Sequence, residues 1–325
     1  MRGMADVLSN GCRLVFSFKG KWVEFFKKQT HINFLGLRSW AVGLSLLLMM
    51  ISAGALLTKG LRWGLDFTGG SQLQVSFNHT ADIPLLRKQL VAAGFNDILV
   101  QSYGTSRDVV ISLAAHQQMT QQDLSAHIIK ALPGSQLKQI EYIGPQVGKE
   151  LATQGALAVF IALLGIMIYI ALRFEYRFAV GAAVALIHDP IVILGMFSLF
   201  NIEFNLTALA AILAVIGYSL NDTIVIFDRI RENFRRLRKG TAVDVVNLSI
   251  NQTLSRTIMT SATTLLVVLS LCLLGGTMIH SFASALIIGI VVGTYSSIYV
   301  AGSIAVALGL DRRHFLHIKK VDDRP

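Results

Sequence analysis

The sequence predicts an α-helical membrane protein with six transmembrane helices and one small α+β domain between the first two. Its 325 residues are 53% hydrophobic and only 15% charged, with a mean hydropathy of +0.59. Such a chain is too apolar for an ordinary soluble globule. The apolar residues fall in six blocks of spanning length or nearly so. The blocks are Trp40 to Leu57, Leu151 to Leu172, Phe178 to Phe200, Leu206 to Phe227, Ile258 to Leu274 and Phe282 to Leu308.

Basic residues predict the orientation of these spans, because Lys and Arg mark the cytoplasmic side. Of the 29 Lys and Arg residues, 21 lie in the two tails and in alternate loops. We therefore expect both termini in the cytoplasm and residues 59–150 on the outer side. The expected order is a cytoplasmic tail 1–39, a first helix 40–58, an outer domain 59–150, a helical bundle 151–308 with a cytoplasmic loop 228–257, and a cytoplasmic tail 309–325.

The sequence disfavours a cleaved signal peptide, a disulfide and a role in nucleic-acid binding. A cleaved signal peptide ending near Ala53-Gly-Ala55 is disfavoured, because this site lies inside the apolar run. Cys12 and Cys272 lie in different compartments and predict no disulfide. The net charge of +10 follows mostly from topology, so it indicates contact with membrane lipid rather than with nucleic acid.

The outer segment predicts a ferredoxin-like domain with the order β-α-β-β-α-β. Alternating or β-rich runs predict the strands, and capping residues predict the helix starts. The elements are a strand 72–77, a helix from Asp82 to Ala93, strands 97–103 and 107–113, a helix from Thr120 to Leu132 and a strand 136–143. His79, His116 and His127 have no catalytic or metal-ligand spacing, so we expect no enzyme and no metal site.

Two glycine-bearing segments join this domain to the membrane. The first contains Gly64, Gly69 and Gly70, and the second contains Gly144 and Gly148. Glycine permits positive φ and tight chain reversal, which suits hinges. Tight turns that only leave the membrane are an equally good interpretation.

Asp222 is the leading candidate functional residue. A carboxylate in a membrane segment costs about 2.5 to 3.5 kcal/mol on insertion scales, so a chain that retains one usually uses it. Ser219 shares its helix face and Asn221 is adjacent. At 1.5 Å per residue Asp222 lies about 24 Å from Leu206, in the cytoplasmic half of the bilayer.

The fifth span offers a partner for this acid. Arg256 and Thr260 begin a second polar stripe at the cytoplasmic end. If Arg256 reaches Asp222, protonation of the acid would free the arginine, which would make a two-state switch. A fixed ion pair that only fastens two helices is the alternative.

The third span carries His188 and Asp189 directly before Pro190. Proline removes a backbone donor and kinks a helix. Asp189 is therefore either a proton relay or a group that satisfies backbone atoms freed by the kink, and both interpretations stay open. In the sixth span Gly289, Gly293, Ser297 and Ala301 recur every four residues, a ridge that favours close helix packing.

Taken together, these motifs resemble the SecF family of protein-export membrane subunits, over nearly the whole chain. The segments that carry the resemblance are Trp63-Gly-Leu-Asp-Phe-Thr-Gly-Gly70, Ile143-Gly-Pro145, His188-Asp189, Gly217-Tyr-Ser-Leu-Asn-Asp-Thr223, Phe227-Asp-Arg-Ile-Arg-Glu-Asn233 and Gln252-Thr-Leu-Ser-Arg-Thr257. The resemblance implies one six-helix half of an RND-like architecture. It also implies that Asp222 is the essential fourth-span acid and Arg256 its basic partner.

The resemblance further implies a function in the bacterial inner membrane. Such a subunit pairs with SecD beside the SecYEG channel, with YajC and YidC as further candidate partners, and uses the proton-motive force to move unfolded secretory polypeptides. Protons are the coupling ion, and no cofactor is expected. The rival hypotheses are a structural subunit without proton coupling, half of a small-molecule RND exporter, and an intramembrane aspartyl protease, whose Gly-x-Gly-Asp signature is missing before Asp222.

Overall fold

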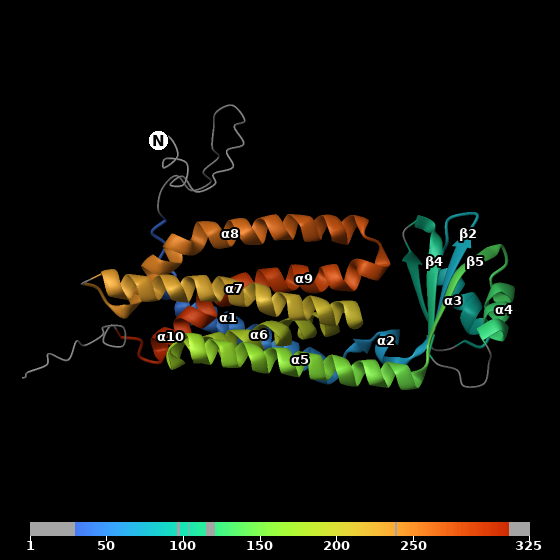
Figure 1. The fold of residues 1–325 in the computed structure, drawn as a ribbon. Helices are drawn as coiled ribbons and strands as arrows, with labels where there is room; N and C mark the ends of the chain where they lie inside the picture. The colour runs from blue at the N-terminus through green and yellow to red at the C-terminus, as the bar shows by residue number, and fades with distance from the viewer. Residues whose placement is uncertain (1–29, 96–97, 104, 115–120, 238, 312–325) are drawn as a thin grey trace, which may run out of the picture.

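The structure, a computed structural model, describes residues 30–95, 98–103, 105–114, 121–237 and 239–311. In these residues six helices are long and apolar enough to cross a membrane. A four-stranded sheet follows the first of them in the sequence and lies beyond one end of the bundle (Figure 1). The predicted fold class is confirmed. Thr120 and most of both tails lie outside the described residues.

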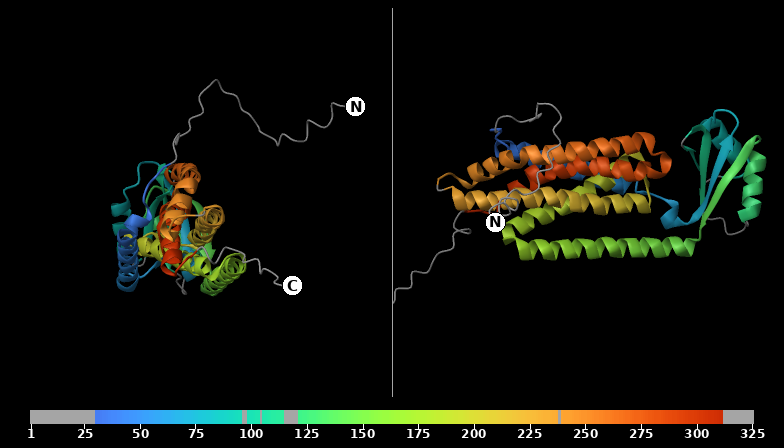
Figure 2. Two further views of the ribbon diagram at one scale, coloured as in Figure 1. Left: turned by 90° about the vertical axis from the view of Figure 1, so that its left-hand side faces the viewer. Right: turned by 45° about the horizontal axis from the view of Figure 1, so that its top comes forward.

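The membrane bundle has three inner and three outer helices. Half of the most apolar stretch of α6, α7 and the last span (50% each) is buried inside the chain, against 22% for α1, 11% for α8 and 6% for α5. Viewed along the bundle, α1, α5 and α8 lie at its periphery (Figure 2). The helices are α1 (Arg38–Thr58), α5 (Pro145–Arg173), α6 (Tyr176–Phe200), α7 (Leu206–Arg236), α8 (Ala242–Leu274) and α9 (Thr277–Tyr295).

Both ends of this set carry short additional elements. A 3₁₀ turn, η1 (Leu35–Leu37), precedes α1. The last span continues from α9 through a π-helix, η2 (Ser296–Ala301), into α10 (Gly302–Ala307). A π-helix inside a span is uncommon and often marks a functional site.

Three helices extend beyond the apolar blocks that predicted them, because apolar length measures a span and not a helix. The expected loop 228–257 is mostly helical, since α7 runs to Arg236 and α8 begins at Ala242 behind a capping box of Thr241 and Asp244. At the other side, α5 begins at Pro145, before its apolar block. Proline at the first helical position, after an extended Gly144, starts the helix in a polar sequence.

The sheet domain, residues 70–143, has the predicted element order. Its sheet has the strand order β3-β4-β2-β5 with every pair antiparallel. Helices α3 and α4 contribute Leu90 and Ile128 to a core that they share with Leu73 and Ile111 of the sheet. The elements are β2 (Gly70–Phe77), α3 (Ile83–Ala92), β3 (Ile98–Tyr103), β4 (Thr105–Ala114), α4 (Gln121–Ala131) and β5 (Ser135–Ile143).

A small structure that the sequence did not predict ties the sheet domain to the bundle. β1 (Arg62–Trp63) pairs in parallel with β6 (Glu203–Phe204), which lies between α6 and α7. The one-turn helix α2 (Leu65–Thr68) follows, and the Phe67 ring stacks on the Phe204 ring with centroids 5.7 Å apart. A strand of two residues is too short to show the alternation of apolar and polar residues from which a sequence predicts strands.

The described ends of the chain lie at the end of the bundle opposite the sheet domain (Figure 1). The backbone N–H groups of Ile32 and Leu35 donate to the side chains of Asn251 and Asn247, at 3.0 and 2.9 Å. Both asparagines belong to the first turns of α8. The loop between α7 and α8 is thus at the same end as both described ends of the chain.

Candidate functional site

A polar cluster lies inside the three inner helices, around Asp189 of α6. Asp189 is only 1% exposed. Its Oδ2 atom accepts hydrogen bonds from the hydroxyl of Ser219 on α7, at 2.6 Å, and of Ser296 on η2, at 2.9 Å. The ring Nδ1 of His188 lies 3.0 Å from Oδ1. One carboxyl group therefore joins α6, α7 and η2 in the middle of the bundle.

Small residues permit this approach. A Cβ atom on Gly293 would lie 2.9 Å from Ser219 Cβ and 3.6 Å from Asp189 Oδ2. A Cβ on Gly289 would lie 2.3 Å from a methyl group of Val215. The expected small-residue ridge of the last span therefore packs directly on α7, as the spacing predicts.

Further hydroxyl groups extend the cluster along α7. Ser297 donates to the carbonyl of Ser219 at 3.0 Å, and Thr223 donates to Ser297 at 3.0 Å. The sequence analysis missed Ser296 and treated Ser297 as a packing residue. The available signal was a pair of adjacent serines within an apolar span.

Asp222, one turn further along α7, is buried at 2% exposure. Its Oδ2 atom has no hydrogen-bond partner among the described residues. The positive charge of Arg256 acts on it, but no ion pair in the described part of the chain joins the two side chains. The structure therefore differs from the alternative of a fixed Asp222–Arg256 pair.

The other sequence-predicted residues near Asp222 point elsewhere. Asn221 and Arg256 are exposed on the outside of the bundle. The hydroxyl of Thr260 donates to carbonyls of its own helix, those of Arg256 and Thr257, at 3.0 Å each. Thr257 is instead the buried residue of this turn, at 1% exposure, and its hydroxyl has no partner among the described residues.

The five glycines predicted as hinges form a closely packed joint, which we call the glycine joint (Gly64–Gly70 and Gly144–Gly148). Gly69 and Gly70 have positive φ values of 72° and 146°, whereas Gly64 and Gly144 are extended and Gly148 is helical. A Cβ on Gly148 would lie 2.9 Å from the backbone N of Gly69 and 3.0 Å from the carbonyl of Phe67. Hinge motion at this joint stays a prediction.

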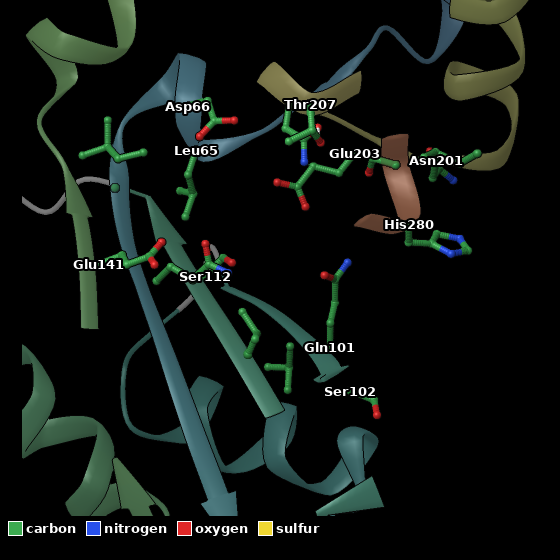
Figure 3. Close-up of a pocket in the computed structure, with 18 of the residues that line it drawn as sticks. Leu65, Asp66, Gln101, Ser102, Ser112, Glu141, Asn201, Glu203, Thr207 and His280 are labelled. Carbon is green, nitrogen blue, oxygen red and sulfur yellow. Dashed lines mark hydrogen bonds between the residues drawn. The ribbon is translucent and has the colours of Figure 1, made fainter. Parts of the chain in front are cut away.

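A second candidate site is the cavity of about 640 Å³ between the sheet domain and the bundle (Figure 3). Asp66 and Glu203 approach it from the bundle side and Glu141 and Gln101 from the sheet (Figure 3). None of the described residues that line it is Lys or Arg. Burial raises the pKa of Glu203 above its ordinary value, and Asp66 adds to this while Arg62 opposes it. The sequence analysis had singled out no side chain here.

Comparisons with known proteins agree with this architecture. The family described as "Protein export membrane protein SecD/SecF, C-terminal" matches residues 122–311, and the SecD/SecF GG motif matches residues 54–81. The protein translocase subunit SecF of Vibrio alginolyticus is 46% identical over 298 residues, which cover 90% of this chain and 95% of that protein. SecF of Escherichia coli O157:H7 is 44% identical over 286 residues, 86% of this chain and 88% of that protein.

Solved structures give the same picture. The crystal structure of SecDF from Thermus thermophilus, described as a translocon-associated membrane protein, matches with a TM-score of 0.78 and 37% identity over 86% of this chain. SecDF in a super-membrane-facing form matches with a TM-score of 0.67 and 37% identity over 87% of this chain. The chain spans 39% of the length of each of these SecDF chains.

Proposed function

Because the chain belongs to the SecD/SecF family and is a SecF-type protein translocase subunit of the membrane, we propose that it drives protein export with the proton-motive force. It would act with a SecD partner beside the SecYEG channel in the bacterial inner membrane. Its substrate would be an unfolded secretory polypeptide. YajC and YidC are further proposed partners, and the proposal requires no cofactor besides protons.

The proposed orientation follows the positive-inside rule. The end of the bundle that holds the described termini and the basic α7–α8 loop would face the cytoplasm. The sheet domain, the cavity and the glycine joint would then lie on the outer side. Protons moving down the gradient would enter from that side.

The observation that carries the proposal is the environment of Asp222. A buried ionised carboxylate costs several kcal/mol unless it is paired. Asp222 is buried without a pair, and the charge of Arg256 acts on it from the neighbouring helix. Two states can therefore have similar free energies. In one, Asp222 is neutral and lies apart from Arg256; in the other, Asp222 is ionised and lies beside Arg256.

Protonation of Asp222 in such a pair would change the packing of the helices. The proton would neutralise Asp222 and release Arg256, and α7 and α8 would repack. A proton that crosses 100 mV supplies about 2.3 kcal/mol, which biases a two-state orientation of the sheet domain by roughly fiftyfold. The glycine joint is the connection through which that orientation would change.

The experiment is protein export by the reconstituted complex in proteoliposomes, with and without a proton gradient. We expect Asp222→Asn to export at the gradient-independent rate only, because a helix-embedded asparagine does not titrate. Arg256→Gln should also lose the part of the export rate that depends on the proton gradient. Asn221→Ala is the matched control, because this neighbour is exposed and should keep the wild-type response.

A structural subunit without proton coupling is the second candidate. It is favoured by the absence of an ion pair between Asp222 and Arg256 among the described residues. Under this alternative Asp222→Asn exports like the wild type at every gradient while the complex stays assembled. That outcome would refute the proposal.

A further inference from the structure

We propose that His188 and Asp189 form a second proton-binding site, on the outer side of Asp222, and that the π-helix η2 exchanges hydrogen bonds when this site is loaded. The inference rests on the proposed function, because it adds a step to the same proton path. It chooses between the two interpretations of Asp189 that the sequence left open.

The observed partners of Asp189 disagree with the interpretation that it satisfies backbone atoms freed by a proline kink. Pro190 lacks an N–H group, so the backbone group that it leaves without a partner is the carbonyl one turn earlier, an acceptor. An ionised carboxylate is itself only an acceptor and cannot satisfy a carbonyl. The hydrogen bonds of Asp189 in the described structure all come from side chains: Ser219, Ser296 and His188.

In the proposal, the unloaded pair carries its one proton on His188. The carboxylate of Asp189 accepts hydrogen bonds at Oδ2 from the hydroxyl groups of Ser219 and Ser296. His188 then places its proton on Nδ1, toward Oδ1 at 3.0 Å, and its Nε2 atom keeps a lone pair. This Nε2 is buried, and no described residue bonds to it.

A lateral cavity in the bundle is lined in part by His188. The cavity has a volume of about 380 Å³ and lies between α1, α6, η2 and α10. Ala41, Ser45, Val184, Tyr299 and Ile304 line it together with His188. His188 is 4% exposed and its Nε2 atom is buried beside this cavity.

The pair lies before Asp222 on a path from the outer side. Ser219 and Asp189 are at the same level, since they are bonded at 2.6 Å. Ser219 precedes Asp222 by three residues of α7, which is about 4.5 Å along the helix axis toward the Leu206 end. A proton that enters from the sheet-domain end therefore meets Asp189 first.

A proton bound by the pair changes its net charge from −1 to 0. The proton joins Nε2 of His188, and the Nδ1 proton can then move to Oδ1 of Asp189, which leaves a neutral imidazole beside a carboxylic acid. In both forms Oδ2 is a weaker acceptor than before. The proton later leaves the pair toward Asp222, and the charge of −1 returns.

Ser296 is the residue whose hydrogen bonds change when the pair binds a proton. Its hydroxyl is shared between Oδ2 of Asp189 at 2.9 Å and the carbonyl of Gly293 at 3.1 Å. When Oδ2 weakens, the hydroxyl turns fully to Gly293. Ser296 is the first residue of η2, and Ser297 beside it holds α7 through the carbonyl of Ser219. Loading the pair thus alters the contact between the last span and the helix of Asp222.

The other titratable groups around the pair are few. Tyr295 of α9 has its ring 6.5 Å from the His188 ring, and Tyr299 of η2 lines the cavity. On α1 the lining polar group is the hydroxyl of Ser45, which does not titrate. From α7 the neighbouring acid is Asp222, one turn away from Ser219. Asp222 is therefore the next carboxyl group on the path.

The first test uses the wild-type complex in lipid nanodiscs and does not depend on any variant folding. Infrared difference spectra are recorded when the pH is lowered from about 8 to about 5, the range in which histidine titrates. We expect a histidine protonation signal that His188→Asn removes and that Asp222→Asn keeps. Because the chain has eight histidines, the outcome that would overturn the inference is a wild-type spectrum identical to that of His188→Asn.

The second test measures gradient-driven export in proteoliposomes. His188→Asn keeps an amide donor near Nδ1 but lacks the basic Nε2, and Asp189→Asn cannot bind a proton. We expect both to lower the gradient-dependent rate about tenfold or more, since a positioned proton-transfer group contributes about 10²- to 10⁴-fold. Tyr299→Phe, in the same cavity, is the control and should retain the rate.

The two proposals fail in different ways. If Asp222→Asn loses gradient-driven export while His188→Asn and Asp189→Asn keep it, the second site is wrong and the proposed function stands. If Asp222→Asn keeps gradient-driven export, the proposed function itself is wrong. A reduced rate that accompanies loss of the partner subunit in co-purification would indicate a purely structural pair, and this also overturns the inference.

Discussion

Replacing Gly148 with alanine should loosen the glycine joint without changing any polar group. The site is the first turn and a half of α5, where the helix passes over the backbone of Phe67 and Gly69. A methyl group there would lie 2.9 Å from Gly69 N and 3.0 Å from the Phe67 carbonyl. These atoms belong to the backbone, so they cannot turn away as a flexible side chain would.

The expected cost follows from this geometry. The new contact at 2.9 Å is about 0.6 Å shorter than the ~3.5 Å at which a carbon atom makes a favourable contact. Overpacking of this kind costs about 1 to 3 kcal/mol. Helix α5 or the α2 segment must therefore move away.

Gly165→Ala is the matched control, because it lies in the same helix and a Cβ there meets nothing within 4 Å. Thermal unfolding and limited proteolysis of the purified protein in lipid nanodiscs measure the two variants. Gly148→Ala should unfold at a lower temperature and release the sheet domain to protease faster. Gly165→Ala should match the wild type or exceed it slightly. Equal behaviour of the two variants would refute the close packing argued for the glycine joint.

Two further predictions concern the outer cavity and the inner cluster. Burial raises the pKa of Glu203 above its ordinary value of 4.5, so the folded state binds this proton more tightly than the unfolded state, and stability falls as the pH rises above about 4.5. Glu203→Gln should accordingly raise the unfolding temperature at about pH 8 but not at about pH 4. An increase of the same size at both pH values would contradict this prediction. Gly293→Ala should displace Ser219 from Asp189 and cost about 1 to 3 kcal/mol in thermal unfolding, whereas Gly217→Ala, with nothing within 4 Å, should cost far less.

The sequence predicted most of the fold because strong periodic signals determine it. Apolar blocks identify the spans, and Asp82 starts α3 as a capping residue, accepting a hydrogen bond from Leu85 N at 3.3 Å. The apolar blocks did not reveal the polar extensions of α7 and α8, because capping and neighbouring helices stabilise these extensions. The β1–β6 pair was missed because it depends on a contact between segments about 140 residues apart.

The candidate site was predicted in part. Residue type alone marked Asp189, Ser219 and Asp222, since polar groups within a span require partners. Which helix supplies each partner is a matter of rotation about the helix axis, and i+3 and i+4 spacing does not determine it. Arg256 is exposed while its neighbour Thr257 is buried, and Ser296 faces Asp189 from a π-helix that shifts the phase of the last span.

In the proposed function, the arrangement along α7 would let two carboxyl groups serve one proton path. Asp189 accepts hydrogen bonds from Ser219 and Ser296, whereas Oδ2 of Asp222 has no partner among the described residues and the positive charge of Arg256 acts on it. In this proposal a proton on Asp189 weakens the bonds that hold α6 against α7 and η2, and a proton on Asp222 removes the attraction between α7 and α8. Sequential loading would therefore loosen α7 from one neighbour and then from the other. Because α7 begins at Leu206, whose N–H donates to Asp66 of α2 at 2.8 Å, any movement of α7 acts directly on the glycine joint.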